Sequence, residues 1–134
     1  MRRARKRVVP TQNALPEALV RRFADDVDRL IGADDTGRIG IAVSGGPDSL
    51  ALLLLSNAAF PDRVEAATVD HRLRADATDE ALFVASVCAD HGIAHTIHTL
   101  DALPEGNVSA AARAARYTAL NHWADARDIY RSVL

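Results

Sequence analysis

The hexapeptide Ser-Gly-Gly-Pro-Asp-Ser at residues 44–49 constrains the fold more than any other feature of this chain. It follows an apolar run at residues 38–43, which predicts a strand, and precedes a Leu-rich run at residues 50–55, which predicts a helix. Pro47 suits the first helical position. A Gly-rich turn from strand to helix aims backbone N–H groups and the positive end of the helix dipole at one point. This arrangement is typical of a phosphate-binding loop.

Each residue type in this loop suits contact with an anion. Gly45 and Gly46 are expected to let the backbone adopt conformations that a side chain forbids, and to let anionic oxygens approach closely. The hydroxyl groups of Ser44 and Ser49 can donate hydrogen bonds to the same oxygens. Asp48 is negatively charged, so we expect it to act through a magnesium ion or on another part of the substrate. A tight turn without a ligand is the alternative.

The other periodicities predict helices alternating with strands. We expect helices at residues 15–31, 47–57, 76–91 and 107–127, and strands at residues 38–43, 64–69 and 93–99. This order implies parallel βαβ units and an α/β fold with a doubly wound parallel sheet. Such a sheet binds its ligand beyond the carboxyl ends of its strands, where residues 44–49 and 71–74 both lie.

Composition narrows the class of protein. Apolar residues make up 49% of the 134 residues and the net charge is −2, so no global field draws the chain to nucleic acid or membrane. No apolar run reaches membrane-spanning length. The single cysteine, Cys88, forms no intrachain disulfide, which favours a cytoplasmic protein.

Basic residues crowd the start of the chain, at Arg2, Arg3, Arg5, Lys6 and Arg7. We expect residues 1–14 to form a flexible basic arm. A solvated tail is the favoured interpretation. An arm that neutralises RNA phosphates and a transit peptide are the alternatives.

The loop lacks the lysine of GxxxxGK[ST] and the spacing of GxGxxG, and instead resembles the SGGxDS signature of N-type ATP pyrophosphatases, the PP-loop superfamily. Residues 69–74, Val-Asp-His-Arg-Leu-Arg, resemble the VDHGLR element of tRNA(Ile)-lysidine synthetases, with Arg72 where that family usually has Gly. Residues 106–117 are similar to the same family's GN…AAR…RY element. The resemblance spans residues 39–127 and implies an adenine-nucleotide alpha-hydrolase-like, Rossmann-like fold.

The resemblance also implies an activity: ATP-dependent ligation of lysine to the wobble cytidine of isoleucine tRNA through an adenylated cytidine. Asp48 is then expected to be catalytic and to hold magnesium. The expected nucleotide contacts are Ser44, Gly45, Gly46, Pro47, Asp48, Ser49, His71, Arg74 and Arg113. Arg113 and Arg116 are three residues apart, on one helix face, and guanidinium groups suit phosphate or RNA backbone. A solvated helix face for the arginines and a structural role for His71 remain open.

Two other functions remain open: another ATP-pyrophosphatase ligase that forms amides, such as a relative of NAD or GMP synthetases, and a non-catalytic nucleotide-binding module. One cysteine disfavours the sulfur-inserting branches. In the family the domain continues with a further strand and a His- and Asp-rich segment, and residues 128–134 match neither. We therefore expect residues 15–134 to form the N-terminal portion of a truncated PP-loop ATP-binding domain, with the strand at residues 38–43 as an exposed edge.

A few further polar and aromatic residues of the predicted helices are expected to be structural rather than chemical. Acidic residues at 76, 79 and 80 suit the start of a helix, where they complement the helix dipole. Tyr117, His122 and Trp123 are expected to pack within the domain.

Overall fold

The structure is a computed structural model that describes residues 15–32, 37–72, 75–100, 108–127 and 129–133. Its elements are α1 (Glu17–Ile31), β1 (Arg38–Ala42), α2 (Pro47–Ala59), β2 (Val64–Asp70), α3 (Ala77–Asp90), β3 (Ala94–Thr99), α4 (Val108–Ala126) and β4 (Ile129–Val133). The predicted alternation of helices and strands is confirmed. The basic arm at residues 1–14, the helix start at Asn107 and the candidate nucleotide contact Arg74 lie outside the described residues.

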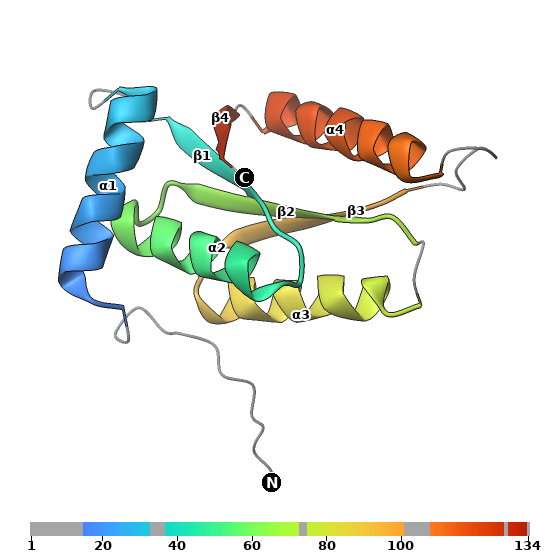
Figure 1. Cartoon of the computed structure of the whole chain (residues 1–134), viewed down its shortest axis with the longest axis horizontal. Coiled ribbons are helices and arrows are strands. Elements are labelled where there is room, and N and C mark those ends of the chain that lie inside the picture. Colours follow the sequence, from blue (N-terminus) through green and yellow to red (C-terminus); the bar gives the residue numbers. More distant parts are fainter. Residues whose placement is uncertain (1–14, 33–36, 73–74, 101–107, 128, 134) are drawn as a thin grey trace, which may run out of the picture.

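The strands form a parallel sheet in the order β3-β2-β1-β4. Helices α2 and α3 lie on one face, α4 lies on the other, and α1 packs against α2 (Figure 1). The expected α/β, doubly wound parallel sheet is therefore confirmed. Within the described ranges, no helix is both long enough and apolar enough to span a bilayer.

The edge predicted for β1 is wrong, and so is the expectation that residues 128–134 supply no further strand, because β4 pairs with β1. Ile39 is in register with Arg131 and Ile41 with Val133, so β1 is hydrogen-bonded on both sides. The five-residue run of β4 contains β-branched and aromatic residues that favour strands. This run is too short for an alternating apolar pattern to identify it as a strand, and β1, with which it pairs, lies far away in the sequence.

The larger core lies between the sheet and helices α2 and α3. Ile41, Leu53, Leu54 and Val84 have no exposed surface, and α1 covers the outer side of α2. The apolar character of α2 all round its axis is thereby explained, since it is buried on two sides.

The smaller core lies between α4 and the sheet, and it depends on Gly40. A Cβ atom on Gly40 would stand 3.0 Å from Cη2 of Trp123 and 3.0 Å from Cγ2 of Ile129. The expected packing of Trp123 is confirmed, since 3% of it is exposed. The same expectation is wrong for Tyr117 and His122, which are both exposed. Helix periodicity alone does not tell where along a helix its covered face ends.

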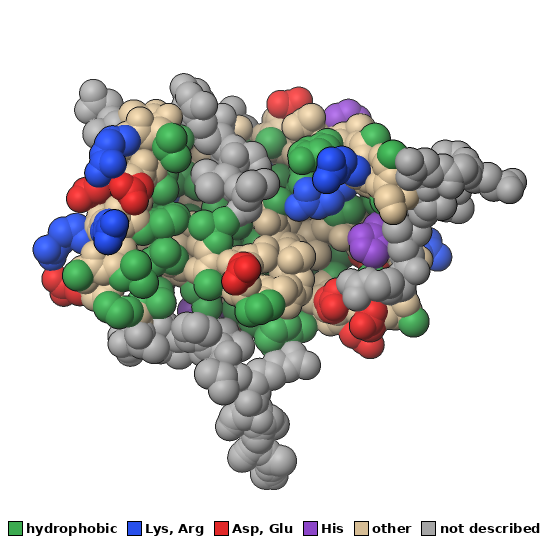
Figure 2. Space-filling view, in the orientation of Figure 1, with side chains coloured by type: hydrophobic (Ala, Val, Ile, Leu, Met, Phe, Trp, Pro, Cys, Tyr) green, Lys and Arg blue, Asp and Glu red, His purple; other side chains and the backbone are tan. Residues whose placement is uncertain are grey.

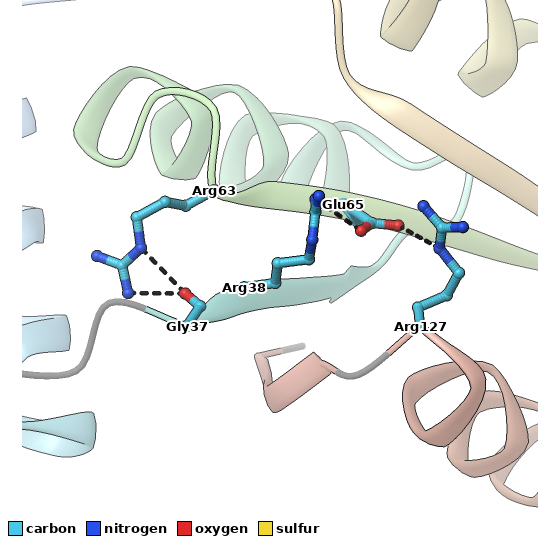
Figure 3. Close-up of polar contacts among 5 residues, drawn as sticks. All are labelled: Gly37, Arg38, Arg63, Glu65 and Arg127. Carbon is cyan, nitrogen blue, oxygen red and sulfur yellow. Dashed lines mark hydrogen bonds and ion pairs between the residues drawn. The ribbon is translucent and has the colours of Figure 1, made fainter.

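A buried carboxylate ties three elements together at the amino ends of the strands, away from the Gly-rich loop (Figure 3). Glu65 of β2 has a side chain only 3% exposed, and its Oε1 accepts a hydrogen bond of 3.0 Å from Nε of Arg127. Nη1 of Arg38 lies 2.8 Å from Oε2, as an ion pair without hydrogen-bond geometry. Beside them, the Arg63 guanidinium donates to the carbonyl of Gly37. This cluster holds the end of α4 against the starts of β1 and β2.

Two histidines of β3 make the stability of the fold depend on pH. Burial lowers the pKa of His95, and the nearby His98 lowers it further; burial also lowers the pKa of His98. The Nε2 atom of His95 lies 2.8 Å from the Thr68 hydroxyl. The unfolded chain therefore takes up protons at a higher pH than the folded chain does.

We expect the free energy of unfolding to have its maximum value when the pH is above 6.5, the ordinary pKa of histidine. It should fall as the pH is lowered through and below that value. Urea unfolding on both sides of that pH measures the change. A His95→Gln, His98→Gln double variant should flatten the dependence. The matched control is His122→Gln, at an exposed position, and this variant should keep the pH dependence of the unsubstituted chain. An equal pH dependence in all three proteins would contradict this account.

Candidate functional site

The Gly-rich loop joins β1 to α2 and is held by its own two serine hydroxyls. The N–H of Val43 donates to the Ala67 carbonyl at 2.8 Å, which extends the sheet to the loop. The N–H of Ser44 donates to Oγ of Ser49 at 2.9 Å, and the N–H of Gly46 to Oγ of Ser44 at 3.3 Å. Each hydroxyl oxygen thus accepts from the loop, and neither proton has an acceptor among the described residues. Both hydroxyls can donate to a ligand outside the loop.

The conformational argument for the two glycines is wrong. Gly46 has φ −76° and ψ 157°, which any residue adopts, and Gly45 has no positive φ either. Gly45 is small because a Cβ there would lie 2.9 Å from Cβ of Glu80 on α3. At Gly46 the nearest atom would be the Ser44 hydroxyl oxygen, at 3.6 Å, so the space beside it is open. The argument for close approach therefore applies to Gly46, while Gly45 allows the packing of α3.

Asp48 lies in the first turn of α2 and is exposed. Within the described ranges, no three His, Cys, Asp or Glu side chains gather as metal ligands. One carboxylate is still a suitable partial ligand for Mg²⁺, which usually takes one or two protein carboxylates together with substrate phosphates and water. The loop thus fits a magnesium ion that arrives with a phosphate ligand.

The carboxylate of Asp70 shapes the segment that follows β2. Asp70 is 4% exposed; its Oδ1 accepts the Arg72 N–H at 3.0 Å and its Oδ2 accepts the Thr78 hydroxyl at 2.6 Å. These bonds join the end of β2 to the start of α3. His71 follows at the same edge of the sheet as the loop and is half-buried. We did not expect this structural role of Asp70, since nothing in the sequence marks Thr78 as its partner.

Arg72 occupies a backbone conformation that favours glycine. Its φ is 59°, in the left-handed region. This explains why a glycine suits the position in the VDHGLR element that residues 69–74 resemble. The arginine therefore causes local backbone strain at this position.

An Arg72→Gly variant is expected to raise the free energy of unfolding by about 1 kcal/mol, because relief of the left-handed strain exceeds the entropy that glycine adds to the unfolded chain. Denaturant unfolding measures the gain. Asp62 is a matched control with φ 67°, and Asp62→Gly should gain less because aspartate tolerates this region better. If Arg72→Gly lowered the free energy of unfolding while Asp62→Gly did not, the proposed backbone strain at Arg72 would be contradicted.

Helix α4 brings Arg113, Arg116 and Tyr117 to the opposite face of the sheet from α2. Arg113 is exposed, Arg116 is half-buried, and Cζ of Arg116 lies 6.0 Å from the centre of the Tyr117 ring. Figure 2 shows blue basic side chains along α4 and red carboxylates at the start of α3. The predicted neighbourhood of Arg113 and Arg116 on one helix is confirmed, whereas the ligand that they contact stays a prediction.

The sequence profile of the PP-loop domain matches residues 19–133. The chain belongs to the PP-loop domain family. It is 45% identical over 118 residues to a tRNA(Ile)-lysidine synthase of Zymomonas mobilis, a match that covers 86% of this chain and 34% of that protein. It is 49% identical over 99 residues to that of Novosphingobium aromaticivorans, covering 74% and 29%. The predicted lysidine-synthetase relationship is thus confirmed, and this PP-loop chain spans about a third of the length of these curated relatives.

Two solved structures share the PP-loop chain's fold. A U34-tRNA thiolase of Methanococcus maripaludis superposes with a TM-score of 0.70 at 20% identity, over 87% of this chain and 45% of that one. An NH3-dependent NAD synthetase of Campylobacter jejuni gives 0.64 at 16% identity, over 86% and 54%. These likenesses confirm the expected α/β fold.

Proposed function

We propose that this PP-loop chain is the ATP-binding part of a tRNA(Ile)-lysidine synthetase, which ligates lysine to the wobble cytidine of isoleucine tRNA. The observation that carries the proposal is the 45% identity to a tRNA(Ile)-lysidine synthase across 86% of the chain. The arrangement of the site supports it, since the loop at residues 44–49 and His71 follow adjacent strands at one edge of the sheet. As a tRNA-modifying enzyme it would work in the cytoplasm.

The loop is assigned to the pyrophosphate of ATP. The N–H groups of Asp48 and Ser49 lie in the first turn of α2, where a helix offers no carbonyl partner, and the helix dipole adds positive potential there. The hydroxyl groups of Ser44 and Ser49 add two donors, and the open space at Gly46 lets phosphate oxygens approach. Together these groups would neutralise the charge that develops on the leaving pyrophosphate.

Asp48 is the residue that would hold a magnesium ion against the phosphates. When bound, such an ion supplies charge neutralisation and orientation of the phosphate oxygens. Among the described residues, Asp48 is the exposed carboxylate within the loop itself, whereas Asp70 is engaged by Thr78 and by the Arg72 N–H.

The proposed reaction has two displacements. The carbonyl oxygen of the wobble cytidine attacks the α-phosphorus of ATP, a P–O bond forms, and the bond to pyrophosphate breaks. The lysine amine then attacks the activated carbon of the adenylated cytidine, loses a proton, and AMP leaves. The loop fixes the phosphates for in-line attack. His71, Arg74 and Arg113 are the proposed additional contacts of the adenylate.

An exchange assay tests this function. We expect the chain to incorporate labelled pyrophosphate into ATP only when isoleucine tRNA carrying the wobble cytidine is present, because the base is the group that is adenylated. Exchange supported by nicotinate adenine dinucleotide instead would favour a relative of NAD synthetases. If the chain bound ATP but exchanged no pyrophosphate under any condition, it would be a non-catalytic nucleotide-binding module.

A further inference from the structure

The face of α4 that packs on the sheet changes character along the helix. Leu120 and Trp123 are buried on the sheet at 8% and 3% exposure. Toward the start of the helix, at spacings of three and four residues, the same stripe continues as Tyr117, Arg116 and Arg113. A helix turns about 100° per residue, so all five side chains leave from one side. Tyr117 is nevertheless 51% exposed, Arg113 is exposed and Arg116 is half-buried, so this half of the stripe is covered only in part.

The half of the stripe that holds Tyr117, Arg116 and Arg113 lies level with the Gly-rich loop. Trp123 contacts Gly40 of β1, and α4 runs opposite to the strands (Figure 1). Arg116 is seven residues before Trp123, roughly 10 Å along the helix, which corresponds to about three residues along a strand. Three residues beyond Gly40 is Val43, directly before the loop. Arg116 and Tyr117 therefore face the region beyond the carboxyl end of β1 from the side opposite to α2.

We propose that Arg116 and Tyr117 form a platform on which an unpaired base of the RNA substrate stacks, with Arg113, the proposed contact of the adenylate, beside it. The proposal rests on the proposed function. An exposed aromatic ring with a guanidinium group over it is the kind of surface that splayed-out bases bind, and the arginines complement the charge of the flanking phosphates. A protein partner with an apolar face would gain nothing from these two charges.

The direction of in-line attack favours a base of the RNA substrate, rather than the adenine of ATP, as the group that stacks on Arg116 and Tyr117. In-line displacement requires the attacking oxygen to enter opposite the leaving pyrophosphate. The pyrophosphate is assigned to the loop that opens α2, at the carboxyl edge of the sheet and on the side of α2. On this assignment the attacking base would enter from the side of α4, which lies on the opposite face of the sheet from α2 (Figure 1).

A binding experiment with the full chain tests the platform. The probes are a fluorescent anticodon stem-loop of isoleucine tRNA with the wobble cytidine, and a hairpin that keeps the same stem but has no unpaired anticodon bases. Tyr117→Ala should weaken binding of the stem-loop about 5- to 100-fold, since one base stack is lost. Tyr117→Phe should stay within about twofold, because the ring is kept. Binding of the closed hairpin and of ATP should not change.

Leu30→Ala is the matched control, because Leu30 is a 78% exposed apolar residue on α1. It should bind the stem-loop as the unsubstituted chain does, and circular dichroism should show that all variants fold. Equal stem-loop affinity in Tyr117→Ala would overturn the platform while leaving the proposed function intact. Weaker ATP binding in Tyr117→Ala would overturn it in favour of adenine stacking. If the unsubstituted chain bound no RNA, both the platform and the RNA part of the proposed function would fail.

Discussion

A Gly46→Val variant is expected to fold and to lose ATP affinity by about 100-fold or more, because the loss of even two hydrogen bonds to a charged ligand costs about 3 kcal/mol or more. Gly46 has an ordinary extended backbone, and its Cβ would meet nothing closer than the Ser44 hydroxyl oxygen at 3.6 Å. The fold therefore admits a side chain there. The branched side chain would fill the space through which phosphate oxygens approach the first turn of α2. Calorimetric titration with ATP measures the loss.

Gly45→Val separates the two roles of the loop glycines. It would drive a side chain into Glu80, 2.9 Å from the Cβ position, so it should lower the free energy of unfolding as well as ATP affinity. Gly46→Val should cost only about 1 kcal/mol of stability, as expected for a branched residue at a helix N-cap. Unchanged ATP affinity in a folded Gly46→Val variant would contradict the assignment of the loop to the pyrophosphate of ATP.

The second large effect is expected at the opposite edge of the sheet. An Arg38→Met, Arg127→Met double variant should lose about 3 to 5 kcal/mol of unfolding free energy, because it leaves the buried Glu65 carboxylate without a compensating charge. Glu65→Gln should cost less, since both arginines are 51% exposed and can turn to water. Denaturant unfolding of the three proteins gives the comparison.

The matched control removes two arginines from exposed ion pairs. Arg21 pairs with Glu17 and Arg29 with Asp26, and all four side chains are at least 54% exposed. Arg21→Met, Arg29→Met should therefore change stability by no more than about 1 kcal/mol. An equal loss in the control and in the Glu65 cluster would show that burial of the carboxylate does not matter.

Local signals in the sequence were sufficient for the order of elements from α1 to α4 and for the loop, but not for β4. The strand at residues 38–43 and the helix opened by Pro47 are both set by short-range patterns of apolar residues, proline and glycine. Because parallel strands end at one edge, the neighbourhood of the loop and His71 followed from topology alone.

Long-range contacts were beyond the reach of such patterns. The contact of Glu80 with Gly45 and the pairing of β4 with β1 join segments that are distant in the chain. The bond from Thr78 to Asp70 spans eight residues, and no local pattern marks the two side chains as partners. The exposure of Tyr117 depends on where β1 ends beneath α4, which helical spacing does not encode. The left-handed backbone of Arg72 was hidden for a related reason, since arginine itself gives no sign of it.

The central claim is that the loop at residues 44–49 binds the pyrophosphate part of ATP, and a competition titration tests it most directly. The chain is titrated with ATP, with pyrophosphate and with AMP, each in the presence of magnesium. We expect pyrophosphate to bind and to displace ATP, and AMP to bind at least tenfold more weakly than ATP, because AMP lacks the phosphates that the loop contacts. AMP binding as tightly as ATP, with no competition from pyrophosphate, would contradict the claim.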